Sequence, residues 1–171
     1  ELVITVVDSA AAYPIVIDPL SSTTGAMLEV DRPGALFGTT VSSAGDVNGD
    51  GYSDVLVGVP SFDAAVGDEG AVFLFMGSAA GLSTTAAWTW SGGQGGAQCG
   101  WACSTAGDVN GDGYSDVLIG EPLWDNGQTN EGRALLFLGS ASGLGPAPAW
   151  TKEGDQAEAR CGHSVATAGD V

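Results

Sequence analysis

The feature that most constrains this chain is a nine-residue segment, DVNGDGYSD, which occurs twice without change. It spans residues 46–54 and again 108–116, at an interval of 62 residues, and AGDV at 168–171 begins a third copy. The longer segments 44–60 and 106–122 differ at only two positions, Val57/Ile119 and Val59/Glu121. A unit repeated at this period is typical of folds that stack copies of one supersecondary structure.

The repeated segment carries oxygen donors at its positions one, three, five and nine, with glycines between them that permit tight turns. Calcium takes six to eight oxygen ligands from carboxylates, amide and main-chain carbonyls and water. A plain pair of strand-connecting turns is the alternative, but three carboxylates in nine residues repel one another unless a cation is present. The sequence therefore predicts two complete calcium sites and a third begun at Asp170. The predicted ligands are Asp46, Asn48, Asp50, the Tyr52 carbonyl and Asp54, and then Asp108, Asn110, Asp112, the Tyr114 carbonyl and Asp116.

The residues after the loop exclude two other calcium-binding modules that share its opening. An EF-hand needs an acid at position twelve and a following helix, whereas position twelve here is Val57 or Ile119. A dockerin-type module fails for the same reason, and its repeat is much shorter. A strand is expected after each loop.

The charge of the chain limits its partners. Four basic residues stand against 21 acidic ones, for a formal net charge of −17. Such a surface repels phosphate backbones and anionic lipid head groups, so nucleic-acid and membrane-surface partners are not expected. No apolar run approaches the length of a membrane span, so no membrane insertion is expected either. Without a starting Met, and with its end inside a repeat, the chain is expected to be a piece of a longer protein.

Each repeat is expected to contain four strands separated by turn residues. The segment 71–76 is apolar throughout, which indicates that both faces of its sheet are covered. Four-stranded antiparallel sheets packed face to face between similar sheets are blades of a β-propeller. The expected strands are 36–44, 54–59, 70–77 and 86–91 in the first repeat, and 100–106, 116–120, 132–139 and 147–151 in the second.

These motifs together resemble a known family. Phe37-Gly38, the calcium loop and Gly58-Val59-Pro60 resemble the FG-GAP repeat of integrin α-subunit propellers and of many bacterial secreted proteins. The second repeat matches with Cys99-Gly100 and Gly120-Glu121-Pro122, and Cys161-Gly162 begins a third. The resemblance implies an all-β propeller, commonly of seven blades, with calcium loops between the first and second strands. Integrin members bind protein ligands, whereas others accompany enzyme domains or have no assigned activity.

The repeat divides the chain into five segments. Residues 1–24 are read as a β-rich segment from a preceding domain or linker, and 25–35 as an orphan strand that could close the last blade. The first blade is 36–92, the second is 93–154, and 155–171 begin a third. Two blades cannot close a ring, so the remaining blades, or another chain, must complete it.

The three cysteines allow two interpretations. Cys99 and Cys103 are too far apart along one extended strand to form a disulfide. Either could meet Cys161 of the neighbouring blade in an oxidising compartment, and buried small side chains are the alternative.

His163 and the paired tryptophans are expected to have packing roles. His163 is the only histidine, and no converging partner indicates a zinc or catalytic role for it. Trp88 and Trp150 occupy equivalent positions and are expected to pack between blades.

The resulting prediction is a secreted or cell-surface calcium-binding propeller module, with a structural or adhesive role toward an extracellular protein or glycan. It is not expected to be an enzyme. The alternative is a scaffold or accessory domain of an extracellular hydrolase or lyase, for which Glu121 or Glu153 could serve as an acid, although no paired nucleophile or base is evident.

Loop divergence indicates which end of the blades would bind a partner. The turns at 77–82 and 139–144 are nearly identical and share an end with the calcium loops, whereas 61–69 and 123–131 at the opposite end differ. Divergent loops on a rigid scaffold suit recognition. The predicted partner-binding residues are Phe62, Asp63, Trp124 and Asp125.

Overall fold

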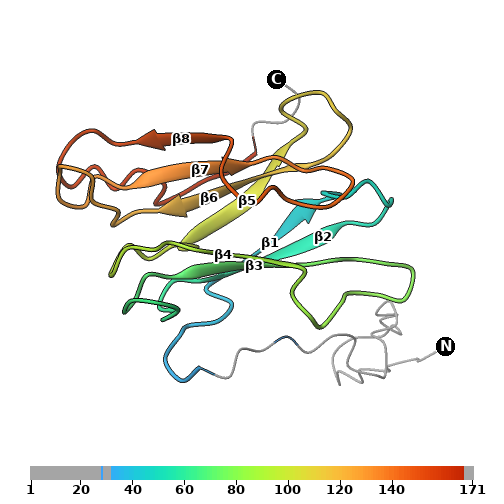
Figure 1. Cartoon of the computed structure of the whole chain (residues 1–171), viewed down its shortest axis with the longest axis horizontal. Helices are drawn as coiled ribbons and strands as arrows, with labels where there is room; N and C mark the ends of the chain where they lie inside the picture. The colour runs from blue at the N-terminus through green and yellow to red at the C-terminus, as the bar shows by residue number, and fades with distance from the viewer. Residues whose placement is uncertain (1–27, 29–31, 168–171) are drawn as a thin grey trace, which may run out of the picture.

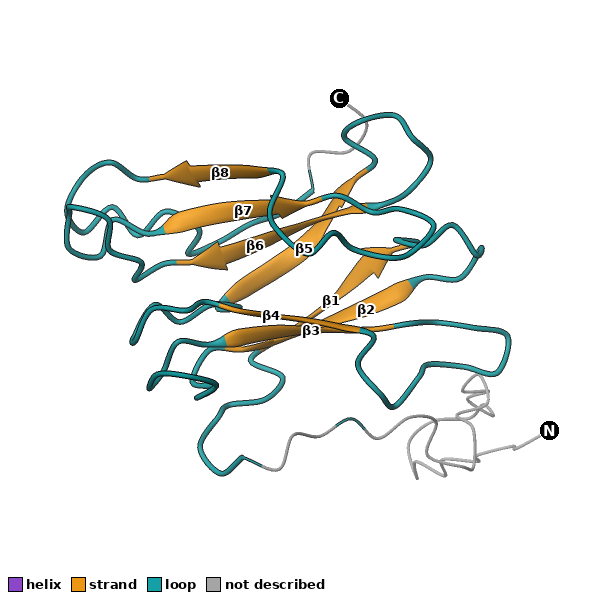
Figure 2. Ribbon diagram, in the orientation of Figure 1, coloured by secondary structure: helices purple, strands orange, loops and turns teal. Residues whose placement is uncertain are grey.

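The computed structural model describes residues 28 and 32–167, which form two four-stranded antiparallel sheets stacked face to face (Figure 1). The first sheet has the order β1-β2-β3-β4 and the second β5-β6-β7-β8, so each strand pairs with its neighbour in sequence. The part of the chain that the structure describes is built from strands and loops only (Figure 2), and it contains no helix that could span a membrane. The strands are β1 (Thr40–Gly45), β2 (Asp54–Val59), β3 (Ala71–Phe75), β4 (Trp88–Ser91), β5 (Ala102–Gly107), β6 (Asp116–Glu121), β7 (Arg133–Phe137) and β8 (Trp150–Glu153).

All eight expected strands are present, but several of their ends differ from the sequence prediction. β1 begins at Thr40 and not at residue 36, because Leu36 and Gly38 have φ angles of 60° and 82° and form a turn. The N–H of Thr39 donates to the carbonyl of Leu36 and closes that turn at 3.2 Å. β8 begins at Trp150 and continues to Glu153, beyond the expected end at residue 151.

The strands of the two sheets are paired in the same way, residue for residue. Leu56 pairs with Leu74 in the first sheet, and Leu118 pairs with Leu136 in the second. Each first strand ends in a register shift directly before the nine-residue loop, between Ser43 and Gly45 and again between Thr105 and Gly107. Such a bulge bends a strand and redirects the chain. Both repeated loops therefore leave their sheets at equivalent positions.

The main hydrophobic core lies between the two sheets. Leu56, Val72 and Leu74 of the first sheet meet Ile119, Leu135 and Phe137 of the second, and all six are buried. Both Trp88 and Trp90 place their rings 5.0 Å from the Phe137 ring. This confirms the expected packing role of Trp88, whereas Trp150 is 49% exposed. Every residue of β3 is buried, as its unbroken apolar sequence predicted.

Glycines allow the backbones of successive repeats to approach closely. A Cβ atom on Gly58 would lie 2.1 Å from the carbonyl oxygen of Gly100, and one on Gly120 would lie 1.8 Å from that of Gly162. Isolated parallel bridges join Gly70 to Cys99 and Gly132 to Cys161 at the same crossings. The spacing between one repeat and the next therefore depends on these contacts.

Candidate functional site

The first nine-residue loop is folded around the side chain of Asp46. Its Oδ1 accepts the N–H groups of Gly49 at 2.7 Å and Asp50 at 3.1 Å, and its Oδ2 accepts that of Gly51 at 2.8 Å. Asp50 in turn accepts the N–H of Tyr52 at 3.0 Å. The acidic side chains therefore determine the loop conformation as well as its charge.

Asp54, the last acid of the loop, is fully buried. Its Oδ2 accepts the N–H of Val47 at 3.0 Å, and its Oδ1 accepts that of Gly77 at 2.9 Å. Burial raises the pKa of this carboxyl above its ordinary value, and the negative charges of Asp50 and Asp46 add to the increase, while the two N–H bonds oppose it. Ionised Asp54 is thus held at an energetic cost that a nearby cation would reduce.

The second loop repeats these contacts. Asp108 accepts the N–H groups of Gly111 and Gly113, each at 2.8 Å, and Asp116 accepts those of Val109 and Gly139, each at 2.9 Å. The loop N–H groups, with that of Gly113 contributing most, lower the pKa of the Asp108 carboxyl. Two separate regions of sequence therefore produce one geometry.

The two loops are also joined to each other. The N–H of Ser115 donates to the carbonyl of Asp46 at 2.9 Å, and the Oγ of Ser115 accepts the N–H of Asp46 at 3.1 Å. Val47 accepts the N–H of Ser140 at 3.0 Å. The first loop is consequently fixed to the second sheet as well as to its own.

The donor set of each loop suits calcium, since carboxylate, amide and main-chain oxygens are the ligands of a hard cation. In the structure these oxygens accept N–H groups, and the side-chain amide of Asn48 donates to Asp50 Oδ2 at 3.0 Å. The predicted ligand Asn110 makes the equivalent bond to Asp112 at 2.8 Å. Asp170 lies outside the described residues.

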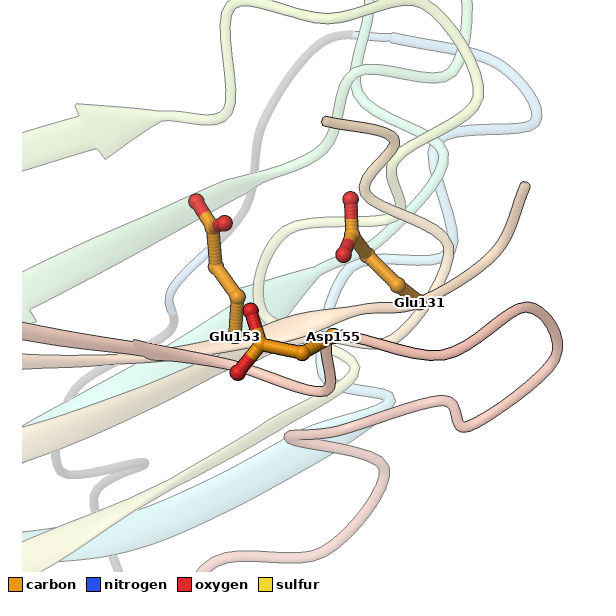
Figure 3. Close-up of side chains that lie close together, drawn as sticks. All are labelled: Glu131, Glu153 and Asp155. Carbon is orange, nitrogen blue, oxygen red and sulfur yellow. The ribbon is translucent and has the colours of Figure 1, made fainter. Parts of the chain in front are cut away.

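A different group of acids lies closest together in the described part of the chain. Oxygens of Glu131, Glu153 and Asp155 lie within 4.8 Å of one another, at the end of the blades opposite the nine-residue loops (Figure 3). Each acid already has a partner. The main-chain N–H of Asn126 donates to Glu131, its side-chain amide donates to Glu153 at 3.0 Å, and Lys152 pairs with Asp155 at 2.6 Å.

Sequence reasoning missed this acidic group, although the repeat contains a signal for it. The positions of Glu153 and Asp155 are Ser91 and Gly93 in the first repeat, so only the second repeat gathers acids here. Two hydrogen-bond donors and one ammonium group already occupy these acids, and we do not assign them to a metal.

Glu69, at the position equivalent to Glu131, is buried at the same end of the first sheet. Its Oε1 accepts N–H groups from residues 64–66, and its Oε2 accepts that of Gly93 at 2.9 Å. Burial acts to raise the pKa of Glu69, but the four N–H groups together outweigh it and lower the pKa. This carboxylate fixes the β2–β3 loop to the loop that follows β4.

The four predicted partner-binding residues lie on two equivalent loops, between β2 and β3 and between β6 and β7. Phe62 packs edge-on against Phe73 at 5.4 Å, and Trp124 stacks against the guanidinium of Arg133 at 3.2 Å. Both aromatic side chains are half-buried, and the indole N–H of Trp124 has no hydrogen-bond partner among the described residues.

Asp63 and Asp125 are exposed, and each also accepts an N–H of its own loop. The two aromatic residues therefore support the loops, whereas the two acids are available to a partner.

Glu121, one of the two differences between segments 44–60 and 106–122, is buried between the sheets. Its Oε2 pairs with Arg133 Nε at 2.6 Å, and its Oε1 accepts the indole N–H of Trp90 from the first sheet at 3.4 Å. Structural contacts thus occupy both oxygens of the acid that the hydrolase alternative would have used.

The three cysteines are free thiols in the structure. Cys99 and Cys103 are buried, and Cys161 is half-buried. Burial raises the pKa of the Cys99 thiol well above its ordinary value and that of Cys103 to about 11. Both buried cysteines therefore act as small core side chains. His163 is exposed and stacks on Trp101 with ring centres 5.6 Å apart.

Comparison with known proteins defines the class of this molecule. The FG-GAP repeat family matches residues 37–75 and 100–137, which cover the first three strands of each sheet. The chain belongs to this family, and its two sheets are FG-GAP β-propeller blades without a closed ring.

The relatives of the chain include integrin α-subunits. It is 36% identical to mouse integrin alpha-IIb over 129 residues, which are 71% of this chain and 12% of that protein. It is 35% identical to Xenopus laevis integrin alpha-4 over 114 residues, which are 66% of this chain and 11% of that protein. The chain thus matches about an eighth of the length of these relatives.

Proposed function

We propose that this chain is a calcium-binding interaction module of a secreted or cell-surface protein. The family relationship supports an adhesive or interaction role, and the acidic surface is compatible with an extracellular module that avoids nucleic acid. The blades would bind an extracellular protein or glycan, and further blades or another chain would complete the ring. We propose no catalytic activity, because Glu121 and Glu153 already serve structural contacts.

The calcium proposal is carried by one observation: the same set of oxygen donors occurs in both nine-residue loops, at equivalent positions of the two blades. Buried Asp54, whose pKa is raised, lies beside Asp46 and Asp50 in the first loop. A bound divalent cation would offset that repulsion. Binding to the native state alone would contribute about 2.7 kcal/mol per site at a hundredfold excess of ion over Kd.

Thermal unfolding in millimolar calcium and in chelator tests the calcium proposal. We expect a lower melting temperature in chelator, and we expect Asp50→Ala with Asp112→Ala to remove most of that difference. Asp63→Ala with Asp125→Ala is the matched control, because it removes two acids from the opposite loops and should preserve the calcium response. Identical unfolding curves for the wild-type chain in calcium and chelator would show that the loops are only turns.

The surface that would bind a partner is the end of the blades that carries Asp63 and Asp125. Both acids are exposed, and buried Glu69 holds the first of their loops rigidly. Asp63→Asn and Asp125→Asn should weaken capture of a protein or glycan on an array without lowering the melting temperature. Ser78→Ala, at the calcium-loop end, is the control. Loss of capture in the control alone would place the binding surface at the other end.

A further inference from the structure

The two blades present equivalent faces to different surroundings. Val47 of the first blade is fully buried, whereas its counterpart Val109 is 39% exposed. Leu74 is buried and its counterpart Leu136 is only partly so. The second blade covers this face of the first, while no further strand of the described residues covers the same face of the second blade. We call it the outer face: Leu118, Ala134, Leu136, Trp150 and Lys152.

The covered interface shows what kind of surface fits this face. At one position the first blade contributes Trp90, which meets Glu121 of the second blade and packs beside Phe137. One repeat earlier, the equivalent residue Leu28 packs against the apolar cluster that contains Val59, the counterpart of Glu121. The indole N–H of Trp90 thus meets an acid, whereas the alkyl side chain of Leu28 packs against an apolar cluster.

Lys152 occupies the same position on the outer face. It is the charged residue of an otherwise apolar face, and its charge is positive although the chain has a net charge of −17. Its present partner is Asp155, at 2.6 Å, and both side chains are exposed to solvent. A blade docked here as the second docks on the first would bring its own residue at the Glu121 position against Lys152. An alkyl side chain there would offer the Lys152–Asp155 pair no polar partner in place of the water that it loses.

We propose that the outer face is a docking surface for a further FG-GAP blade that carries a carboxylate at the Glu121 position. Lys152 selects that blade by charge, while Leu118, Leu136 and Trp150 supply the apolar contact. This assignment follows from continuity with the interface between the two blades. It rests on the proposed completion of the ring by further blades, and it does not depend on calcium binding or on the identity of a ligand.

A grafted third blade tests the proposal in the full chain. Val171 is equivalent to Val109, so a copy of residues 110–153 added after Val171 continues the repeat in register and carries copies of Glu121 and Arg133. The matched control graft has Val and Ala at those two positions, as the first blade does at Val59 and Ala71. Each graft is made with Lys152 and with Lys152→Met.

The two readouts are hydrogen exchange of the β8 amides and unfolding in urea. With the acidic graft, β8 exchange should slow by about tenfold relative to the chain without a graft, because docking suppresses local opening. Lys152→Met should then reduce the folding equilibrium constant by about fivefold in the acidic graft, and should change it little in the control graft.

Three results would overturn the proposal. Unchanged β8 exchange in both grafts would show that no blade docks on the outer face. Equal stabilisation by the two grafts, with no dependence on Lys152, would show docking without charge selection. Concentration-dependent sedimentation of the ungrafted chain would identify a second copy as the occupant and would also count against the proposal.

Discussion

In the first blade every residue of β3 is buried, whereas β7, its counterpart in the second blade, buries only Leu135 and Phe137 of its five residues. The two strands have equivalent positions, pairings and registers. They differ in what covers them, since the second blade packs on β3, whereas no strand of the described residues packs on the outer face beside β7. Burial in a repeat protein therefore follows the neighbouring repeat more than the local sequence.

The faces that the two blades turn toward the preceding repeat also differ in chemistry. The first blade has Val59 and Ala71 where the second has Glu121 and Arg133. The ion pair is buried and extended by Trp124 on Arg133 and by Trp90 on Glu121. Almost identical sequences thus carry two interface chemistries, one apolar and one charged, and substitutions at matched positions separate their contributions.

The largest effect is expected from breaking the charged interface. Glu121→Val leaves Arg133 without its counter-charge between the blades, and should reduce the free energy of unfolding by about 3–5 kcal/mol. Urea unfolding measures this. Glu121→Val combined with Arg133→Ala recreates the chemistry of the first blade and should recover most of the loss. If the double variant does not recover stability, the ion pair stabilises the interface beyond the mutual neutralisation of its two charges.

A smaller effect is expected from opening the apolar core. Leu74→Ala removes a fully buried side chain and should cost about 3 kcal/mol, within the range known for such cavities. Leu136→Ala at the equivalent position should cost roughly half as much, because its site is partly open and loses less apolar contact. Equal costs from urea unfolding would contradict the difference in burial between the two blades.

The next prediction concerns the buried carboxylate at the loop end. Glu69→Gln should cost about 1–3 kcal/mol at neutral pH, since one amide oxygen cannot replace two carboxylate oxygens that accept four N–H groups. The pKa of Glu69 lies below its ordinary value of 4.5. Its stabilisation is therefore complete above about pH 4.5 and is lost as the pH falls through the lowered pKa.

The free energies of unfolding of wild type and Glu69→Gln, measured from pH 7 to acidic pH, should converge as the pH falls. Glu131→Gln is the comparison in the second blade, where a single N–H bond to the acid is found among the described residues. Its cost should be smaller. A difference between wild type and Glu69→Gln that stays constant with pH would rule out the carboxylate as its source.

The smallest predicted effect concerns the link between the nine-residue loops. Ser115→Ala removes the hydroxyl that accepts the N–H of Asp46 and should cost about 1 kcal/mol. Ser53→Ala changes the same loop position in the first blade, where no cross-blade bond is made to its hydroxyl in the described residues, and should be nearly neutral. Thermal unfolding of the pair measures the link directly, and equal melting temperatures would show that it contributes nothing.

The sequence predicted the architecture well because the repeat provides its own comparison. Apolar periodicity and turn residues located all eight strands, and the buried β3 followed from its unbroken apolar run. The start of β1 was predicted too early, since the left-handed conformation of Leu36 is not visible in its residue type.

The contacts between distant residues were less predictable. Glu121 was recognised as a difference between the repeats, but its pairing with Arg133 and Trp90 depends on register and on blade packing. The four N–H groups around Glu69 come from loops whose conformation leaves no sequence pattern. The contacts of Phe62 with Phe73 and of Trp124 with Arg133 likewise leave no sequence pattern, and the partner-binding role of the two aromatic residues remains a prediction. The calcium ligands and the partner-binding acids remain predictions.

The glycine contacts between repeats have a consequence for how such a chain can evolve. Gly58 meets Gly100, and Gly120 meets Gly162, so each crossing takes one glycine from each of two successive repeats. A gene duplication keeps every crossing intact only if it copies a whole number of 62-residue units. A partial copy would place a side chain where only 2.1 Å or 1.8 Å separates a Cβ from a backbone oxygen. A duplication that adds a complete blade therefore preserves these contacts, and one that adds part of a blade does not.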